Sequence, residues 1–210
     1  MEKSRLILLR HGESTFNALG KFTGTTDVPL TDKGREQALG AGKLLAGTAP
    51  DAAFTSERIR AIDTCTIVLQ ELKSHLVPVQ DHRLNEQDFG DLEGIEKSEA
   101  IKLFGEERVL EWRRAFHAHP PKGERFIAVQ ARVKLFYDEC VKPLLLQNQT
   151  VLVVAHGNSL RALAIFLLDL HLSEIATFEL GNAEPFVLDF SATHHTFTLK
   201  NADQNDSGRF

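Results

Sequence analysis

Two short apolar runs, each followed closely by His-Gly, constrain the fold of this chain most strongly. Residues 5–9 read Arg-Leu-Ile-Leu-Leu and end at Arg10-His11-Gly12, whereas residues 151–155 read Val-Leu-Val-Val-Ala and end at His156-Gly157-Asn158. A continuous apolar run of this length is typical of a strand buried on both faces of a parallel sheet. Because ligands bind beyond the carboxyl ends of such strands, we expect both histidines to face a ligand site at one edge of the sheet.

Further strand and helix patterns alternate along the chain. Shorter strands are predicted at 52–55 and 77–79, and late strands at 178–180, 186–190 and 196–199. Helices are predicted from an N-cap at Thr31 through Leu45 and over 59–72, 126–140 and 160–168, with a loop over 18–30. Such alternation requires right-handed crossovers between parallel strands. The predicted fold is an α/β three-layer sandwich, with a mostly parallel sheet flanked by helices.

The stretch from about 81 to 125 has no strand pattern, and its residues 96–119 are typical of two highly charged helices. We expect this stretch to form a helical insertion over the active site. Residues 1–200 then make a single domain, and the polar tail 201–210 is expected to be flexible.

Composition excludes several classes of protein. The 210 residues hold 24 Lys and Arg against 29 Asp and Glu, a formal net charge of −5, which argues against binding to nucleic acid or to an anionic membrane. No apolar run approaches the roughly 20 residues of a membrane helix, and the first run is too short for a signal peptide. Two cysteines, Cys65 and Cys140, cannot build a disulfide framework, so a cytoplasmic protein is expected.

The residues around the two His-Gly pairs suit phosphoryl transfer. Neutral imidazole is a nucleophile near pH 7, because the reference pKa of histidine is about 6.5, and its attack on a phosphate forms a covalent intermediate. Arg10, and Arg58 or Arg60 after the second predicted strand, offer paired donors to phosphate oxygens. Glu86, just past the third predicted strand, is a carboxylic acid placed to protonate a leaving oxygen.

A purely structural interpretation of these residues stays open. A strand-end histidine is more often a hydrogen-bonded polar residue than a nucleophile. Arg58 and Arg60 also suit a solvated first helical turn. Arg113 and Arg114 also suit an exposed helix face, paired with Glu106, Glu107 and Glu111.

The segment Arg10-His11-Gly12-Glu13-Ser14 resembles the motif of the histidine phosphatase superfamily. Further blocks, in the same order over about residues 5–190, are similar to one branch, the cofactor-dependent phosphoglycerate mutases. These blocks are Phe22-Thr23-Gly24 with Asp27, Pro29-Leu30-Thr31 and Lys33-Gly34; Thr55-Ser56 with Arg60-Ala61; Leu84-Asn85-Glu86 with Gly90, Gly94 and Lys97; Gly105-Glu106-Glu107 with Trp112-Arg113-Arg114; and residues 156–163.

This resemblance implies roles for individual residues. His11 would be the phosphorylated nucleophile, and Glu86 would be the general acid and base. The phosphoryl group would be held by Arg10, Arg60 and His156. The rest of the substrate would contact Ser14, Asn17, Thr23, Gly24, Lys97, Arg113, Arg114, Gly157 and Asn158.

The implied reaction interconverts 3-phosphoglycerate and 2-phosphoglycerate in glycolysis and gluconeogenesis. Its cofactor would be 2,3-bisphosphoglycerate, which primes the histidine, and no metal is expected. The expected partner is a small phosphorylated substrate, and a homo-oligomer stays open. A mutase needs a second cationic site away from the nucleophile, and Lys97, Arg113 and Arg114 in the predicted insertion favour this function.

Two positions depart from the mutase pattern and keep other functions open. After Glu86 the mutases usually carry Arg and, two residues later, Tyr, whereas this chain has Gln87 and Phe89. A lost charged hydrogen bond costs about 1.5–3 kcal/mol, which predicts a weaker mutase or another phosphorylated substrate. The first alternative is a histidine-type phosphatase of small phosphomonoesters. The second is a non-catalytic phospho-ligand binding module.

Overall fold

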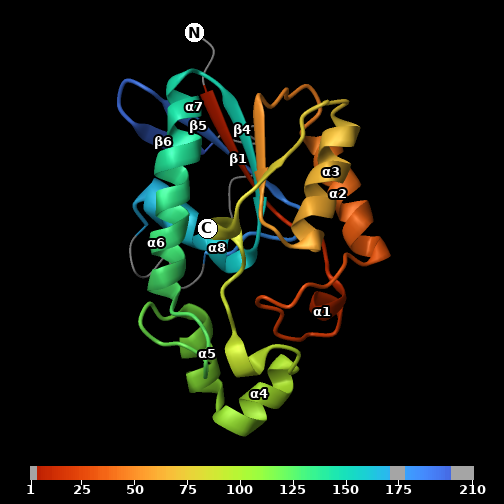
Figure 1. The fold of residues 1–210 in the computed structure, drawn as a ribbon, viewed down its shortest axis with the longest axis vertical. Helices are drawn as coiled ribbons and strands as arrows, with labels where there is room; N and C mark the ends of the chain where they lie inside the picture. Colours follow the sequence, from red (N-terminus) through yellow and green to blue (C-terminus); the bar gives the residue numbers. More distant parts are fainter. Residues whose placement is uncertain (1–3, 171–177, 200–210) are drawn as a thin grey trace, which may run out of the picture.

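The computed structural model describes residues 4–170 and 178–199, whose strands form one six-stranded sheet in the order β3-β2-β4-β1-β5-β6 (Figure 1). The four strands from β3 to β1 run parallel to one another, whereas β5 runs antiparallel to both of its neighbours. The predicted α/β fold with a mostly parallel sheet is confirmed. The strand bounds are β1 Ser4–Arg10, β2 Ala52–Thr55, β3 Val79–Gln80, β4 Thr150–Ala155, β5 Pro185–Ser191 and β6 Thr196–Leu199.

Helices cover both faces of this sheet (Figure 1). Alternate residues of β1 point to opposite faces, so that Leu8 joins the core under α6 and α8 while Ile7 joins the core under α2 and α3. No helix of the described residues is long and apolar enough to cross a membrane. The helix bounds are α1 Thr15–Ala18, α2 Asp32–Leu44, α3 Ile59–Glu71, α4 Lys97–Phe104, α5 Glu106–Arg114, α6 Phe126–Phe136, α7 Lys142–Leu146 and α8 Gly157–Leu168.

Residues 81–125 form α4, α5 and the two short 3-10 helices His82–Leu84 and Gly90–Leu92, and α4 and α5 lie at the bottom of Figure 1. These two helices have a small core of their own, and the Phe22 ring from the loop after α1 packs into it, 5.1 Å from the Phe89 ring. The Phe22 N–H also donates to the Ile95 carbonyl at 3.0 Å. The loop after α1 therefore fastens this segment to the rest of the fold.

Several element boundaries differ from the prediction. Residues 178–180 were predicted as a strand, and this is wrong: their backbone is irregular, because the Leu180 carbonyl accepts a hydrogen bond from Arg10 Nη1 at 3.2 Å instead of serving a strand ladder. α8 begins three residues before the predicted start, α1 was not predicted, and β3 covers Val79–Gln80 instead of 77–79.

The predicted helix over 126–140 is longer than expected. It continues through a π-helix at Tyr137–Val141 into α7. Pro143 lies at the start of α7 and has no N–H to donate one turn back, which is a sufficient reason for the change of winding just before it. The predicted tail 201–210 lies outside the described residues.

Candidate active site

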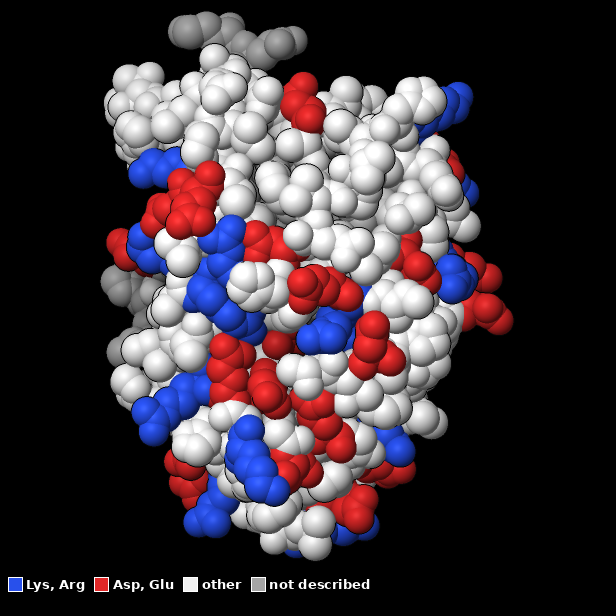
Figure 2. Space-filling model, viewed as in Figure 1, with Lys and Arg blue, Asp and Glu red and all other residues white. Residues whose placement is uncertain are grey.

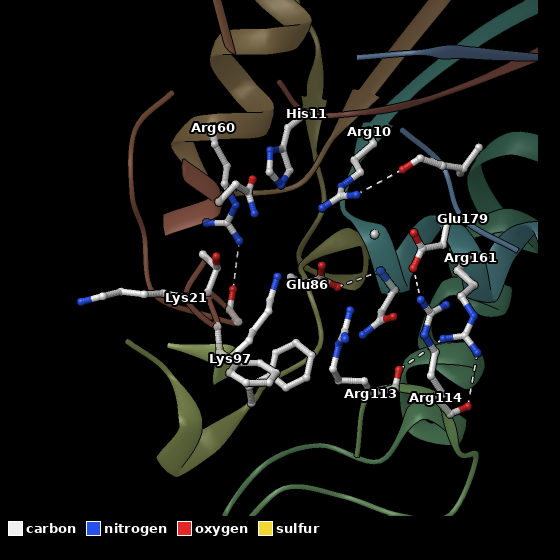
Figure 3. A pocket seen from close by; sticks show the side chains of 18 of the residues that line it. Arg10, His11, Lys21, Arg60, Glu86, Lys97, Arg113, Arg114, Arg161 and Glu179 are labelled. Carbon is white, nitrogen blue, oxygen red and sulfur yellow. Dashed lines mark hydrogen bonds and ion pairs between the residues drawn. The ribbon is translucent and has the colours of Figure 1, made fainter. Parts of the chain in front are cut away.

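A pocket lies between the carboxyl ends of β1 and β4 and the helices α4 and α5 (Figure 3). Charged side chains of both signs crowd the middle and lower parts of the face in Figure 2, where this part of the fold lies. The pocket is locally basic although the whole chain carries a formal charge of −5. Among its lining residues, the acids are Glu86 and Glu179, and the bases are Arg10, Lys21, Arg60, Lys97, Arg113, Arg114 and Arg161.

His11 follows β1 directly and is 3% exposed. Its Nδ1 lies 2.7 Å from the Gly12 carbonyl oxygen. Because a carbonyl only accepts, Nδ1 must carry the hydrogen, and Nε2 is left with a free lone pair. Burial, followed by the charges of Arg60 and Arg10, lowers the pKa of His11 well below 6.5. The side chain is therefore a neutral imidazole at neutral pH, with its nucleophilic nitrogen unprotonated.

His156 follows β4 and is fully buried beside His11, with the two ring centroids 5.0 Å apart. Its Nε2 lies 2.7 Å from the Ser56 hydroxyl, whereas its Nδ1 is buried without a hydrogen-bond partner among the described residues. Burial and the charge of Arg60 lower the pKa of His156 well below 6.5. His156 lies next to His11 but is not itself among the residues that line the pocket.

Two guanidinium groups flank His11. Arg60 is 0% exposed, and its Nη1 and Nη2 donate to the carbonyls of Thr26 and Gly24, both at 2.9 Å. Burial lowers the pKa of Arg60 to about 10, which leaves it charged at neutral pH. The Nε atoms of Arg10 and Arg60 are both buried without a hydrogen-bond partner in the described chain. Free charged donors next to a nucleophile suit the equatorial oxygens of a phosphoryl group.

The loop that supplies these carbonyls is held by Glu93. The two oxygens of its carboxylate accept the N–H groups of Thr25 at 2.7 Å and Thr26 at 2.9 Å. Gly24 has a φ of +55°, and a Cβ there would collide with the Glu93 carboxylate. Glycine at this position therefore lets the loop close over Arg60.

Glu86 enters the same pocket from the loop after the first 3-10 helix (Figure 3). Its Oε1 accepts the backbone N–H groups of Gln87 at 2.9 Å and Asn158 at 3.1 Å. Arg132 fixes the loop, because its guanidinium donates to the carbonyls of Arg83, Asn85 and Glu86. The held Oε1 leaves Oε2 as the oxygen that can carry a proton to or from a ligand. We name Arg10, His11, Arg60, Glu86 and His156 the proximal site.

The Gln87 side chain does not occupy the pocket position that is expected of the mutase arginine. The glutamine side chain is fully buried, donates from Nε2 to the Glu124 carbonyl at 2.8 Å and accepts from Asn158 Nδ2 at 2.7 Å. Gln87 therefore stands behind Asn158 and fixes the orientation of that amide. Phe89, the other departure from the mutase pattern, lines the pocket with its ring against Phe22.

Three half-buried cations lie on the opposite wall, and we name them the distal cluster. Lys97 begins α4, and Arg113 and Arg114 end α5. All three line the pocket, and Lys97 and Arg113 point across it towards His11 in Figure 3. Burial lowers the pKa of each. The interpretation of Arg113 and Arg114 as a plain exposed helix face does not fit this placement.

The remaining predicted residues separate into two groups. Asn17, Thr23, Gly24, Gly157 and Asn158 line the pocket. Ser14 lies behind it, fully buried, where its hydroxyl caps α1 by accepting the Asn17 N–H at 3.3 Å. A direct substrate contact from Ser14 is therefore not supported by its placement.

Sequence reasoning missed several lining residues: Lys21, Phe22, Phe89, Arg161, Phe178, Glu179 and Leu180. Arg161 lies inside the His156 block, and a role for it was detectable there. Its guanidinium donates to the carbonyls of Arg113 and Arg114, both at 3.2 Å, and so holds the end of α5. Residues 178–180 were missed because their apolar ends suggested a strand.

Known proteins resemble this chain along most of its length. The model of the histidine phosphatase superfamily (branch 1) matches residues 6–203. A 2,3-bisphosphoglycerate-dependent phosphoglycerate mutase of Bartonella bacilliformis is 43% identical over 190 residues, which cover 89% of this chain and 92% of that protein. A protein of the same description from Methylorubrum extorquens is 39% identical over 208 residues, which cover 96% of this chain and 98% of that protein.

Solved structures of phosphatases share the fold. A mycobacterial glucosyl-3-phosphoglycerate phosphatase with VO3 has a TM-score of 0.81 at 29% identity, with coverage of 94% of this chain and 97% of that one. The α-ribazole phosphatase of Shigella flexneri has a TM-score of 0.79 at 30% identity, with coverage of 93% and 94%. The sequence matches, the shared fold and the His11 pocket lead to one conclusion: this chain belongs to the histidine phosphatase superfamily, branch 1.

Proposed function

We propose that this protein is a 2,3-bisphosphoglycerate-dependent phosphoglycerate mutase, which interconverts 3-phosphoglycerate and 2-phosphoglycerate through a phosphohistidine. One observation carries the proposal: the pocket places the distal cluster opposite a neutral, buried His11. A substrate with a phosphate at one end and a carboxylate or second phosphate at the other matches both walls. The names of the 39–43% identical relatives support the same activity.

In the phosphorylating half-reaction, which also primes the enzyme, a phosphoryl group passes from an ester oxygen of the ligand to His11. The lone pair of His11 Nε2 forms the N–P bond while the bond from phosphorus to the ester oxygen breaks. Glu86 Oε2 delivers a proton to that oxygen, so that a hydroxyl leaves instead of an alkoxide. The unpartnered Nε atoms of Arg10 and Arg60 bind the equatorial oxygens, where charge gathers in the transition state.

In the other half-reaction, with which each cycle of the primed enzyme begins, the phosphoryl group passes from His11 to the free hydroxyl of a phosphoglycerate and gives a bisphosphorylated intermediate. Glu86, now a carboxylate, takes the proton of the attacking hydroxyl, and the N–P bond breaks to restore neutral His11. The distal cluster retains this intermediate while it reorients, so that its other phosphoryl group is the one that next passes to His11. When bound, 2,3-bisphosphoglycerate supplies the phosphoryl group that primes His11. The donors left free at Arg10 and Arg60 fit the phosphoryl group that such a donor transfers.

The second candidate is a phosphatase, and the phosphatase structures that share the fold favour it. Both activities use the same phosphohistidine, and they differ in whether a hydroxyl or water accepts the phosphoryl group. Two rates measured on one preparation separate them. The first is the conversion of 3- to 2-phosphoglycerate with a trace of 2,3-bisphosphoglycerate, and the second is phosphate release from a panel of monoesters. We expect the first to exceed the second; faster hydrolysis with negligible isomerisation would establish the phosphatase.

A further inference from the structure

The segment 178–183 connects the two walls of the pocket. Its later residues are fastened to the proximal site: the Leu180 carbonyl accepts Arg10 Nη1 at 3.2 Å, Asn182 Nδ2 donates to the His11 carbonyl at 2.8 Å, and the Ala183 N–H donates to the Arg10 carbonyl at 2.9 Å. Leu180 is buried as well. The backbone next to Glu179 is thus anchored beside His11.

From this anchored position, the Glu179 carboxylate reaches the distal wall and forms an ion pair with Arg114 Nη2 (Figure 3). Arg114 is held at its other end, because Arg161 binds its carbonyl. The Arg114 side chain is 20% exposed, whereas that of Glu179 is 61% exposed. The carboxylate therefore lies mostly in solvent, whereas the guanidinium lies mostly within the pocket.

We infer that Glu179 is an internal counter-ion of the distal cluster, which a ligand must displace from Arg114 with a carboxylate or phosphate of its own. Glu179 thereby sets how strongly the pocket prefers ligands with a second anionic group. The inference rests on the proposed function for the choice of ligand. It goes beyond that function, because it assigns a specificity-determining role to a carboxylate inside an anion site.

Charge and geometry give the direction of the effect. A ligand that has a hydroxyl at its distal end leaves the ion pair in place, whereas a ligand with a carboxylate there must break it. An ion pair with one exposed partner contributes at most about 1 kcal/mol, which corresponds to about fivefold in affinity. Glu179→Gln removes the competing charge with little change in shape. It should therefore tighten the binding only of ligands that have a carboxylate at the distal end.

The test uses two ligands that differ at one group. Titration calorimetry on the unphosphorylated protein measures the Kd of 3-phosphoglycerate, which carries a carboxylate, and of glycerol 3-phosphate, which has a hydroxyl in its place. We expect Glu179→Gln to lower the Kd of 3-phosphoglycerate two- to fivefold and to change the Kd of glycerol 3-phosphate by a smaller factor. An equal change for both ligands, or an unchanged Kd for 3-phosphoglycerate, would overturn the inference.

Two further variants separate this role from a general structural one. Glu184→Gln removes an exposed carboxylate from the same part of the chain, and both Kd values should stay as in the parent protein. In an Arg114→Ala background, Glu179→Gln should no longer change the Kd ratio, because the pair is already broken. Retention of the full effect without Arg114 would also overturn the inference. If the Kd ratio responds as expected but isomerisation is absent, the proposed mutase function fails and the inference stands.

Discussion

The two walls of the pocket are built in different ways. His11 and His156 follow directly from β1 and β4, Arg60 lies in the first turn of α3, and all three are at most 3% exposed. The distal cluster lies on two short helices outside the sheet, and its side chains are half-buried. Phosphoryl transfer needs fixed hydrogen-bond donors in a site that excludes water. A substrate that must reorient within the pocket needs a wall that can release it. The difference supports the proposal that the proximal site carries the chemistry and the distal cluster recognises the substrate.

The largest expected effect comes from removing the nucleophile. His11→Ala deletes Nε2, the protein atom that bonds to phosphorus in the proposed mechanism. Isomerisation and monoester hydrolysis should both fall by at least about a thousandfold. Mass spectrometry after mixing with 2,3-bisphosphoglycerate should show an acid-labile phosphate on the parent protein and none on the variant. If His11→Ala still turns over substrate, the covalent mechanism is ruled out.

Removing the proton donor should have the next largest effect, and it should depend on the leaving group. Glu86→Gln retains the size of the side chain but cannot deliver a proton, so turnover of phosphoglycerate should fall about a hundred- to a thousandfold. Hydrolysis of p-nitrophenyl phosphate should fall much less, because p-nitrophenolate leaves without protonation. Steady-state rates on the two substrates measure this contrast. Equal losses on both would assign Glu86 to binding instead of proton transfer.

Removing cations from the distal wall should affect one reaction more than the other. Replacement of Arg113 and Arg114 together by Ala should reduce isomerisation about ten- to a hundredfold, through lost charged contacts to the far anionic group. A small monophosphate makes no contact with the distal cluster, so its rate of hydrolysis should decrease by a smaller factor. Arg108→Ala, on the exposed surface of the same helix α5, serves as the matched control. Equal losses in both reactions would show that the pair is not a recognition site.

The sequence predicted where His11 and His156 lie, because the signals for their positions are local and strong. A run of apolar residues specifies a buried strand, and the residue after that strand must lie at the edge of the sheet. His11 and His156 follow from this argument alone. The assignment of Arg60, Glu86 and the distal residues needed the resemblance to a family, because their positions depend on how loops and short helices pack at long range.

The errors arose where tertiary contacts overrode local patterns. Leu180 and its neighbours have the composition of a strand, but Arg10 takes the carbonyl that a strand would use, and Glu179 is thereby turned into the pocket. The change from the mutase arginine to Gln87 suggested a lost phosphate contact. The fold buries this side chain between Asn158 and Glu124, which no spacing rule indicates, and the lost phosphate contact stays a prediction.

Acidification should act on the proximal site and leave the distal cluster unchanged. His11 and His156 are buried and uncharged, and both have a pKa well below 6.5 in the folded protein, mainly because of burial. In the unfolded chain they take up protons as the pH falls through about 6.5, while the folded protein does not. The contribution of the two histidines to the free energy of unfolding is therefore fully present above that pH, and it decreases as the pH falls below it. Between pH 7.5 and pH 6.0, each histidine should lower the free energy of unfolding by about 0.8 kcal/mol, and the two together by about 1.6 kcal/mol.

Urea denaturation at the two pH values measures this difference. His11→Asn leaves one of the two buried imidazoles, so its loss of stability on acidification should be about half that of the parent protein. The arginines of the distal cluster stay charged throughout this range and contribute nothing to the difference. If the parent protein is equally stable at both pH values, or more stable at pH 6.0, the two histidines are not held neutral, and the nucleophile assigned to His11 loses its physical basis.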